Sequence, residues 1–284
     1  MASNLPFERR DIRFGMDGEI DPHWLDGDAH RTRFYDAMSL MFPEGEKFFI
    51  ESVRMCRDFA EGDPILERDV RAFIGQEAMH RREHIAYNER VGEQGAPVAQ
   101  IEAQLLARLN LARSRLSRGG MLGVTICLEH FTAMLADQVL RHPATLRDAD
   151  PAMQALWQWH ALEETEHKAV AFDLYVRALP RPFERYLRRC NAMLIVTPVF
   201  ISHIWSFNWR LVKSDGQHRD LRGWLRLLYY QFISPGPFVR ILPQWLAWFR
   251  PGFHPWKHDN RALIGDTQKA YDALARTQTS QKPS

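Results

Sequence analysis

Apolar residues recur every three or four positions along most of the chain, and no convincing run alternates apolar and polar residues as a half-buried strand would. This spacing puts the apolar side chains on one face of a helix, and proline or glycine interrupts it at intervals. The pattern predicts helices near residues 30–60, 65–91, 98–117, 121–141, 151–179 and 184–213, with shorter helices after 219. The predicted fold class is all-α.

Breaks in this pattern divide the chain into three parts. Its 284 residues fit one main domain with an extension better than two equal domains. Pro180 and Pro182 end the fifth predicted helix, and the segment after them is rich in tryptophan and arginine. We expect an N-terminal extension over 1–29, a helical bundle over 30–180, and an aromatic-rich helical extension over 181–284 that packs on the bundle.

Glutamate and histidine repeat in one pattern within the predicted bundle. A lone glutamate precedes a Glu-x-x-His sequence, and the same pair recurs later; the residues are Glu46, Glu77, His80, Glu129, Glu164 and His167. Residues i and i+3 share one face of a helix, so each Glu-x-x-His presents both side chains to one side. In ferritin-like bundles the di-metal site is formed by four helices: two carry a Glu-x-x-His sequence, and the other two carry one glutamate each. The pattern therefore predicts a ferritin-like four-helix bundle whose long connection, residues 92–120, contains its own helix.

The first lone glutamate requires a choice between Glu46 and Glu51. Glu46 has aromatic and aliphatic neighbours at helical spacings, whereas Glu51 has mainly charged ones. Glu46 precedes Glu77 by 31 residues, which is close to the 35 residues between the two glutamates of the second copy. We expect Glu46 to be the ligand and keep Glu51 in reserve.

The last predicted ligand helix offers more candidates than the pattern needs. His160 lies one turn before Glu164 on the same face and is a candidate seventh ligand. Glu163 is either a substitute for Glu164 or a partner of a ligand, and His84 is a second candidate partner. Glu166 is expected on the surface. Oxygen and imidazole donors in this number favour two metal ions, with iron preferred, manganese second and zinc less suited.

A competing motif overlaps the first Glu-x-x-His. The sequence His80-Arg-Arg-Glu83-His84 has the H-x-x-E-H arrangement of a class of zinc peptidases, in which the glutamate acts as a base. This interpretation leaves Glu46 and His167 without a role and ignores the repeat. We therefore prefer the di-metal pattern.

Composition excludes several classes of protein. A net charge of +2 is too small an excess of positive charge to indicate nucleic-acid binding. The three cysteines are far apart and form no C-x-x-C, so neither a zinc ribbon nor a disulfide framework is expected. The N-terminus lacks the apolar segment of a secretory signal, and we expect a cytoplasmic protein.

Tryptophan alternates with arginine and lysine after Pro182. The run 222–230 is amphipathic and basic, which fits either a membrane-surface element or an aromatic shell over the bundle. The most apolar stretch, 192–207, contains Pro198 and His203 and is short for a spanning helix. We expect this segment to form an aromatic shell over the bundle, with peripheral membrane contact as the alternative. Assembly into a homodimer is a further possibility that the sequence leaves open.

Several of these stretches resemble the predicted metal-dependent hydrolase family, a ferritin-like group. They are residues 42–49, 73–84, 129–133 and 159–173, and residues 251–256 extend the likeness. The resemblance implies a metal-dependent enzyme, but the family name does not describe a mechanism. His160-x-x-x-Glu164-x-x-His167 is also similar to the last ligand helix of di-iron aminobenzoate N-oxygenases, which carry one extra histidine. That likeness implies His160 as a ligand and implies nothing about the substrate.

Three functions follow from these observations. The first is a di-iron oxidase or oxygenase acting on a small hydrophobic substrate in a dry pocket. The second is a metal-dependent hydrolase, in which two metals would generate hydroxide and polarise an ester, amide or phosphoester. The third is a non-catalytic bundle that stores metal or keeps a structural polar core.

Overall fold

The computed structural model describes residues 6–280, most of which are helical and none of which belongs to a named strand. Parts of the two predicted extensions, residues 1–5 and 281–284, lie outside the described residues. The α-helices are α1 (Ala29–Ser39), α2 (Phe42–Met55), α3 (Pro64–Glu93), α4 (Val98–Arg115), α5 (Arg118–Arg141), α6 (Pro151–His167), α7 (Val170–Ala178), α8 (Pro182–Ser214), α9 (Leu221–Phe232), α10 (Pro237–Ala247) and α11 (Gly265–Ser280). The short 3₁₀ helices are Arg57–Ala60, Pro143–Thr145, Pro255–Lys257 and Arg261–Leu263. The predicted all-α class is confirmed.

Two predicted helix starts are confirmed by their caps. The carboxylate of Asp63 accepts hydrogen bonds from the backbone N–H groups of the first turn of α3, and Asp150 does the same for α6. A proline follows each cap, at a position whose missing N–H has no partner within the helix anyway. The two helices that carry the Glu-x-x-His sequences therefore begin at fixed residues.

Two predicted helices are each divided in the structure. Residues 30–60 form α1 and α2 separated at Leu40 and Met41, because the ring of Pro43 cannot continue a helix through Ser39, four residues earlier. Residues 151–179 form α6 and α7, separated at Lys168, whose ammonium bonds His258 O and Asn260 Oδ1. Residues 118–120, which lie between two of the predicted helices, form instead the first turn of α5.

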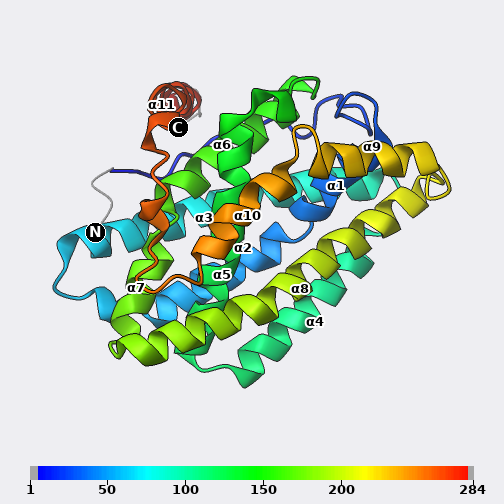
Figure 1. Cartoon of the computed structure of the whole chain (residues 1–284). Coiled ribbons are helices and arrows are strands. Elements are labelled where there is room, and N and C mark those ends of the chain that lie inside the picture. The colour runs from blue at the N-terminus through cyan, green and yellow to red at the C-terminus, as the bar shows by residue number, and fades with distance from the viewer. Residues whose placement is uncertain (1–5, 281–284) are drawn as a thin grey trace.

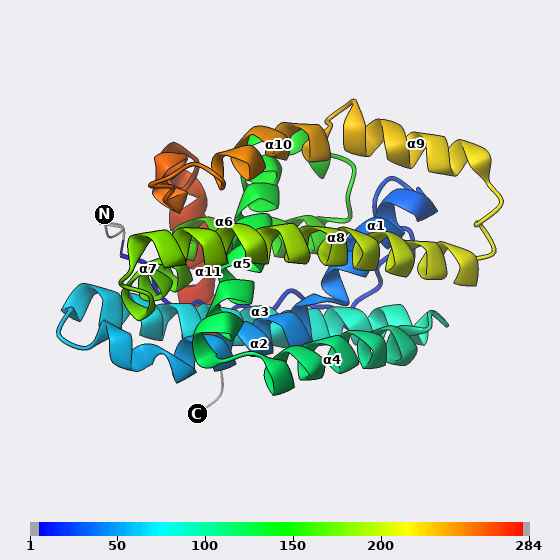
Figure 2. The same cartoon turned by 60° about the horizontal axis from the view of Figure 1, so that its bottom comes forward.

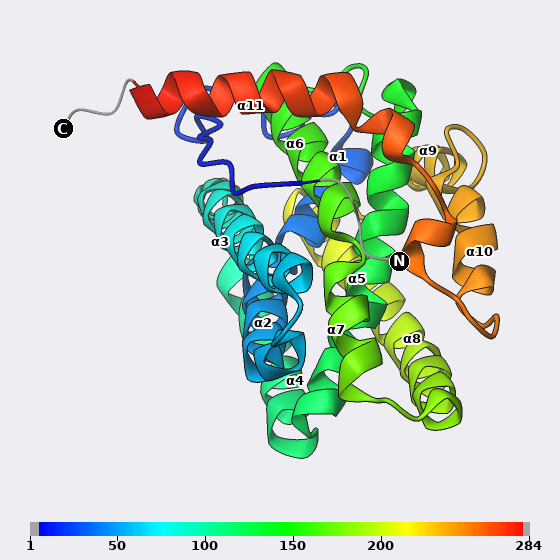
Figure 3. The ribbon, with the colours of Figure 1, turned by 90° about the vertical axis from the view of Figure 1, so that its left-hand side faces the viewer.

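Four helices enclose the centre of the molecule. Helix α2 packs along α3, and α5 packs along α6, while contacts between α2 and α5 and between α3 and α6 join the two pairs. Figure 3 shows α2 and α3 on one side, with α5 and α6 beside them. Helix α4 lies in the connection from α3 to α5, as predicted, and packs against both α2 and α3.

The C-terminal helices α8, α9 and α10 form one outer layer. They pack on α1 and α5, and Figures 1 and 3 place all three on the same side of the molecule. In Figure 2, α9 and α10 lie at the top, α8 runs across the middle and α4 lies at the bottom, where Arg210 of α8 bonds Gln100 and Gln104 of α4. Buried side chains such as Phe207, Leu227 and Ile241 attach the layer to the common core.

The N-terminal segment is also part of this core. Phe7 and Ile12 are buried, and the segment runs below α11, as Figure 3 shows. Arg10 bonds Asp272 of α11, and Gln278 bonds the backbone of Arg13. The division at residues 29 and 181 stays a prediction about domains, but one hydrophobic cluster spans all three parts.

A buried ion-pair group ties α1 to the end of α8. Arg33 bonds Asp36 at 2.8 Å and both carboxylate oxygens of Asp215 at 2.7 and 2.8 Å. Asp36 also accepts hydrogen bonds from Tyr87 and Trp24. Removing the guanidinium would leave the buried carboxylate of Asp36 and the partly buried carboxylate of Asp215 without their arginine partner.

We expect Arg33→Met to lower the free energy of unfolding by about 3 kcal/mol or more, because breaking a buried pair leaves an uncompensated charge. Urea denaturation followed by circular dichroism measures the change. The double variant Arg33→Met/Asp215→Asn should recover part of the loss, since it removes one of the two stranded charges. A loss below about 1 kcal/mol would contradict the structural role of this group.

Candidate metal centre

The structure brings the predicted ligand residues together inside the four central helices. Glu46 comes from α2, Glu77 and His80 from α3, Glu129 from α5, and His160, Glu164 and His167 from α6. All seven side chains are buried; none is more than 4% exposed. Whether they bind metal stays a prediction, but the side chains selected by spacing share one place in the core.

The atoms of this group lie at short distances from one another. His167 Nε2 lies 3.2 Å from Glu77 Oε1 and 3.6 Å from both Glu129 Oε2 and Glu164 Oε2. On the other side, Glu164 Oε1 lies 3.5 Å from His80 Nδ1 and 3.3 Å from His160 Nε2. Glu164 therefore stands between two halves of the cluster, one with His167 and the other with His80 and His160.

Three overlapping groups of donor atoms could each surround an ion. Within each group the donor atoms all lie within 4.8 Å of one another; the groups are Glu46–His80–His160, Glu77–His80–Glu164 and Glu77–Glu129–His167. The first and third groups share no residue, and the second connects them. This arrangement fits two neighbouring metal positions with Glu77 and Glu164 between them.

Unsatisfied polar atoms also point to bound cations. Both carboxylate oxygens of Glu46, Glu77 and Glu129 are buried without a hydrogen-bond partner, as are one nitrogen each of His160 and His167. Buried polar atoms in proteins are almost always paired, and an isolated buried charge is very costly. The residues present therefore fit a di-metal group, and their oxygen and imidazole donors suit iron or manganese.

Hydrogen bonds orient two of the histidines from outside the cluster. His167 Nδ1 lies 2.9 Å from Gln76 Oε1, an acceptor, so Nδ1 carries the proton and Nε2 presents its lone pair to the cluster. His80 Nε2 lies 3.0 Å from Glu163 Oε2, which leaves Nδ1 directed at Glu164. Glu163 thus lies behind His80, one of the two roles considered for it from the sequence.

Arg10 holds these outer partners in place. Its guanidinium donates to Glu163 and, through two nitrogens, to Glu166 at 2.7 and 2.8 Å. Glu166 also accepts a hydrogen bond from Gln76. The surface position expected for Glu166 is therefore wrong, because a cation from the N-terminal segment draws this carboxylate into the interior, where it is 1% exposed.

A second chain of hydrogen bonds orients His160. The Ser39 hydroxyl donates to Asn88 Oδ1, so it accepts from His84 Nδ1 at 2.8 Å. His84 Nε2 is then an acceptor for His160 Nδ1, also at 2.8 Å. His160 Nε2 is left as the lone-pair atom, facing Glu164. Burial, with nearby histidines, holds the pKa of His84 well below its usual range, consistent with this neutral form.

The reserve candidate Glu51 lies outside the cluster. Its carboxylate accepts a hydrogen bond from Arg113 of α4 at 2.7 Å, and its side chain is 35% exposed. Glu83, the base of the alternative zinc motif, bonds Arg82 and the backbone N–H of Phe14. Neither carboxylate shares a candidate metal group, which favours the repeated Glu-x-x-His pattern.

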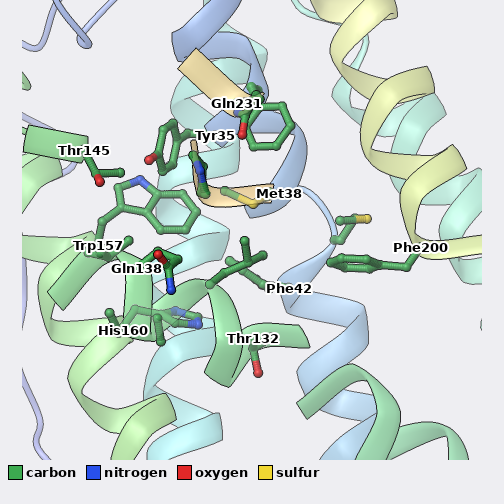
Figure 4. A pocket seen from close by; sticks show the side chains of 17 residues that line it. Tyr35, Met38, Phe42, Thr132, Gln138, Thr145, Trp157, His160, Phe200 and Gln231 are labelled. Atoms are coloured by element: carbon green, nitrogen blue, oxygen red, sulfur yellow. The ribbon is translucent and has the colours of Figure 1, made fainter. Parts of the chain in front are cut away.

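Two apolar hollows reach the cluster. A groove of about 640 Å³ between α2, α4, α5 and α8 has Glu46 and Thr132 among its lining residues. A smaller cavity of about 50 Å³ ends at His160, and Figure 4 shows Trp157 and His160 along one side, with Phe42 near them. The surroundings of the donor atoms are therefore mostly aromatic and aliphatic.

Burial and mutual repulsion shift the protonation of the cluster. Burial raises the pKa of Glu46 and of Glu129 well above the ordinary value, and nearby carboxylates raise both further. Burial alone would lower the pKa of His80, but Glu163 and Glu164 raise it to about 10. Without metal, protons must neutralise part of the carboxylate charge.

The comparison with known families agrees with this chemistry. A model described as "Predicted metal-dependent hydrolase" matches residues 8–259. The chain belongs to this family. No curated protein and no solved structure matches it, so the similarity to aminobenzoate N-oxygenases receives no support. The family description and the donor groups together indicate a metal-dependent enzyme.

The sequence alone did not reveal four residues that position the ligands: Arg10, Ser39, Gln76 and Asn88. Gln76 immediately precedes Glu77 and was available as a signal, since ligating histidines usually donate to a nearby acceptor. Arg10 gave no such signal. It lies far along the chain from every ligand and reaches the centre only through tertiary packing.

We expect two metal ions per chain in protein produced with iron supplied, because two of the three donor groups, the first and the third, share no residue. Glu46→Ala should weaken metal binding about tenfold or more, whereas the matched Glu51→Ala should leave it unchanged. Elemental analysis and competition with a chelator measure both. One zinc ion per chain, or equal effects of the two substitutions, would show that the ligand assignment is wrong.

Metal binding should release protons. Because the pKa of His80 is raised to about 10, the ring is protonated at neutral pH in the metal-free protein, and a metal must displace that proton. Affinity should therefore rise with pH until the pH exceeds this pKa. Calorimetric titration in buffers of different ionisation enthalpy counts the protons. An affinity that is constant between about pH 6 and 8 would contradict the expected coupling.

Proposed function

We propose that this chain is a di-metal carboxylate enzyme, with iron preferred, that oxidises or oxygenates a small hydrophobic molecule. One observation carries the proposal: a dinuclear set of donor atoms stands at the inner end of an apolar groove and of a small apolar cavity. Iron held by these residues would supply the redox chemistry needed to react with dioxygen. Manganese is the second choice of metal, and zinc, which lacks redox chemistry, is the least suited.

The chain's own residues would bind and orient the reacting molecules. The groove is wide enough for a small organic substrate, and its apolar walls favour one without charge. The cavity at His160, about 50 Å³, has room only for a molecule of the size of dioxygen or water. Phe42 lines both hollows, so it stands between the substrate and the small molecule.

Exclusion of water is the second contribution of the protein. The ligand side chains are almost fully buried, and aromatic rings such as Phe73 and Trp159 contact the ligating histidines. A dry, apolar site strengthens electrostatic interactions among the donor atoms and limits side reactions with water. The acceptor oxygens of Gln76 and Glu163, which lie beside His167 Nδ1 and His80 Nε2, keep the rings oriented and so reduce reorganisation during the reaction.

Hydrolysis is the second candidate, and the family description favours it. Two metals can generate a hydroxide nucleophile and polarise a carbonyl or phosphoryl oxygen, and the same ligands would hold them. Both hollows, however, are lined mostly by carbon atoms, and the arginines of the groove, Arg108 and Arg115, are exposed at its outer side. An ester of a hydrophobic acid is the hydrolytic substrate that fits this lining.

Anaerobic iron loading followed by rapid mixing with dioxygen tests the proposal. The reduced protein should consume dioxygen and give a transient absorption band. His160→Ala should slow this reaction or weaken metal binding by at least about tenfold, and Glu51→Ala is the matched control. Cleavage of ester substrates without reaction with dioxygen would establish the hydrolase instead. If fully metal-loaded protein catalysed neither reaction, the third hypothesis, a non-catalytic metal-binding bundle, would be the one supported.

A further inference from the structure

The charge of the chain is strongly asymmetric. Residues 182–250, which form α8, α9 and α10, contain ten Lys and Arg but three Asp and Glu, a net charge of +7. The whole chain carries +2, so the remaining residues together carry −5. One layer of the molecule therefore concentrates positive charge on an otherwise acidic protein, which favours an anionic partner.

The same layer also concentrates exposed apolar side chains. Among the described residues, 15 of the 21 large hydrophobic residues that are exposed lie between Phe183 and Leu246. Leu221 is 74% exposed, Leu225 66% and Ile195 66%. Single exposed apolar residues are ordinary, but a collection of this size on three adjacent helices marks an interaction surface.

Each of these helices has two faces. The inner faces pack on α1 and α5, on the side of the molecule that Figures 1 and 3 show. The exposed positions of these helices are leucine, tyrosine and phenylalanine, with arginine between them. By length and composition α5 and α8 are long and apolar enough to cross a membrane, but α5 is mostly buried in the core. Helix α8 is held to α5 and α1 along its inner side, so a bilayer would meet it from one side only.

A basic pocket opens beside α10. Its volume is about 600 Å³, and five Lys or Arg side chains are among its lining residues: Arg141, Lys168, Arg240, Arg250 and Lys257. The one acidic residue of the lining is Asp137, whose carboxylate already bonds Arg141 and Asn260. The pocket is therefore suited to an anionic group, and it adjoins the helix that carries exposed Val239, Leu242 and Leu246.

We propose that the face formed by α8, α9 and α10 docks on the surface of an anionic phospholipid bilayer. The exposed apolar side chains enter the interface, the surrounding arginines contact phosphate groups, and the basic pocket receives one lipid headgroup. Combined apolar and basic faces are the features that bind helices to such surfaces. Exposed Ile195 and Val199 also line the groove that reaches Glu46, so docking would open that groove to lipid; this last consequence alone rests on the proposed function.

Co-sedimentation of the full chain with vesicles tests docking independently of activity. The protein should bind vesicles of phosphatidylcholine mixed with phosphatidylserine, bind vesicles of phosphatidylcholine alone more weakly, and lose affinity as salt increases. Absence of binding to the anionic vesicles, or equal binding to both kinds of vesicle, would overturn the proposal.

Paired substitutions locate the surface. Leu225→Glu/Leu242→Glu should lower the partition coefficient at least about tenfold, whereas Ile65→Glu, an equally apolar exposed site on α3, should not change it. Arg240→Gln/Arg250→Gln should lower binding to anionic vesicles about fivefold or more, with Arg57→Gln/Arg71→Gln as the matched control. Circular dichroism of each variant verifies folding.

A second copy of the chain is the competing occupant. Sedimentation velocity without vesicles distinguishes it, because a monomer supports the proposal. A stable dimer that dissociates in Leu225→Glu/Leu242→Glu, together with no vesicle binding by the wild type, would assign the face to a homodimer and overturn lipid docking.

Discussion

The structure depends on the charge balance of four carboxylates that converge from four helices. Glu46, Glu77, Glu129 and Glu164 all lie in the interior, and the nearest nitrogen atoms in contact with them belong to histidines rather than to lysine or arginine. Buried carboxylates repel each other and lose hydration, so protons or cations must neutralise them. The helices can pack around this group only when it is neutralised. Metal binding and folding are therefore two consequences of one constraint.

Parts of the chain far from the ligands complete this constraint. Three histidines are oriented by three separate acceptors: Gln76 for His167, Glu163 for His80, and His84 for His160. The N-terminal segment supplies Arg10, which neutralises Glu163 and Glu166 and also bonds Asp272 of α11. Both ends of the described chain therefore support the centre of the molecule. The candidate metal centre is a property of the whole fold rather than of four helices alone.

The sequence predicted what local periodicity determines. The spacing of each Glu-x-x-His and the apolar neighbours of Glu46 were sufficient to select side chains that the structure brings together. The predicted helix ranges placed the starts of α3 and α6 within one residue. Long-range packing decided the rest. The helical periodicity of the sequence places Glu166 at an exposed position. The residue is buried because Arg10, 156 positions away in the sequence, bonds its carboxylate. The break between α1 and α2 was not predicted, because the helical pattern is strong on both sides of Pro43 and hides the effect of this proline.

The C-terminal layer shows how one amphipathic pattern serves two requirements. The inner positions of α8–α10 form the aromatic and aliphatic shell expected from the sequence; Trp248 and Phe207, for example, are completely buried. A shell alone, however, needs apolar residues on one face of each helix only. The outer positions carry a second apolar set with arginine between its members, and packing within the described chain leaves that set uncovered. Since exposure of so much apolar surface is unfavourable in water, the outer face indicates a partner, and its charge makes an anionic one the favourable choice.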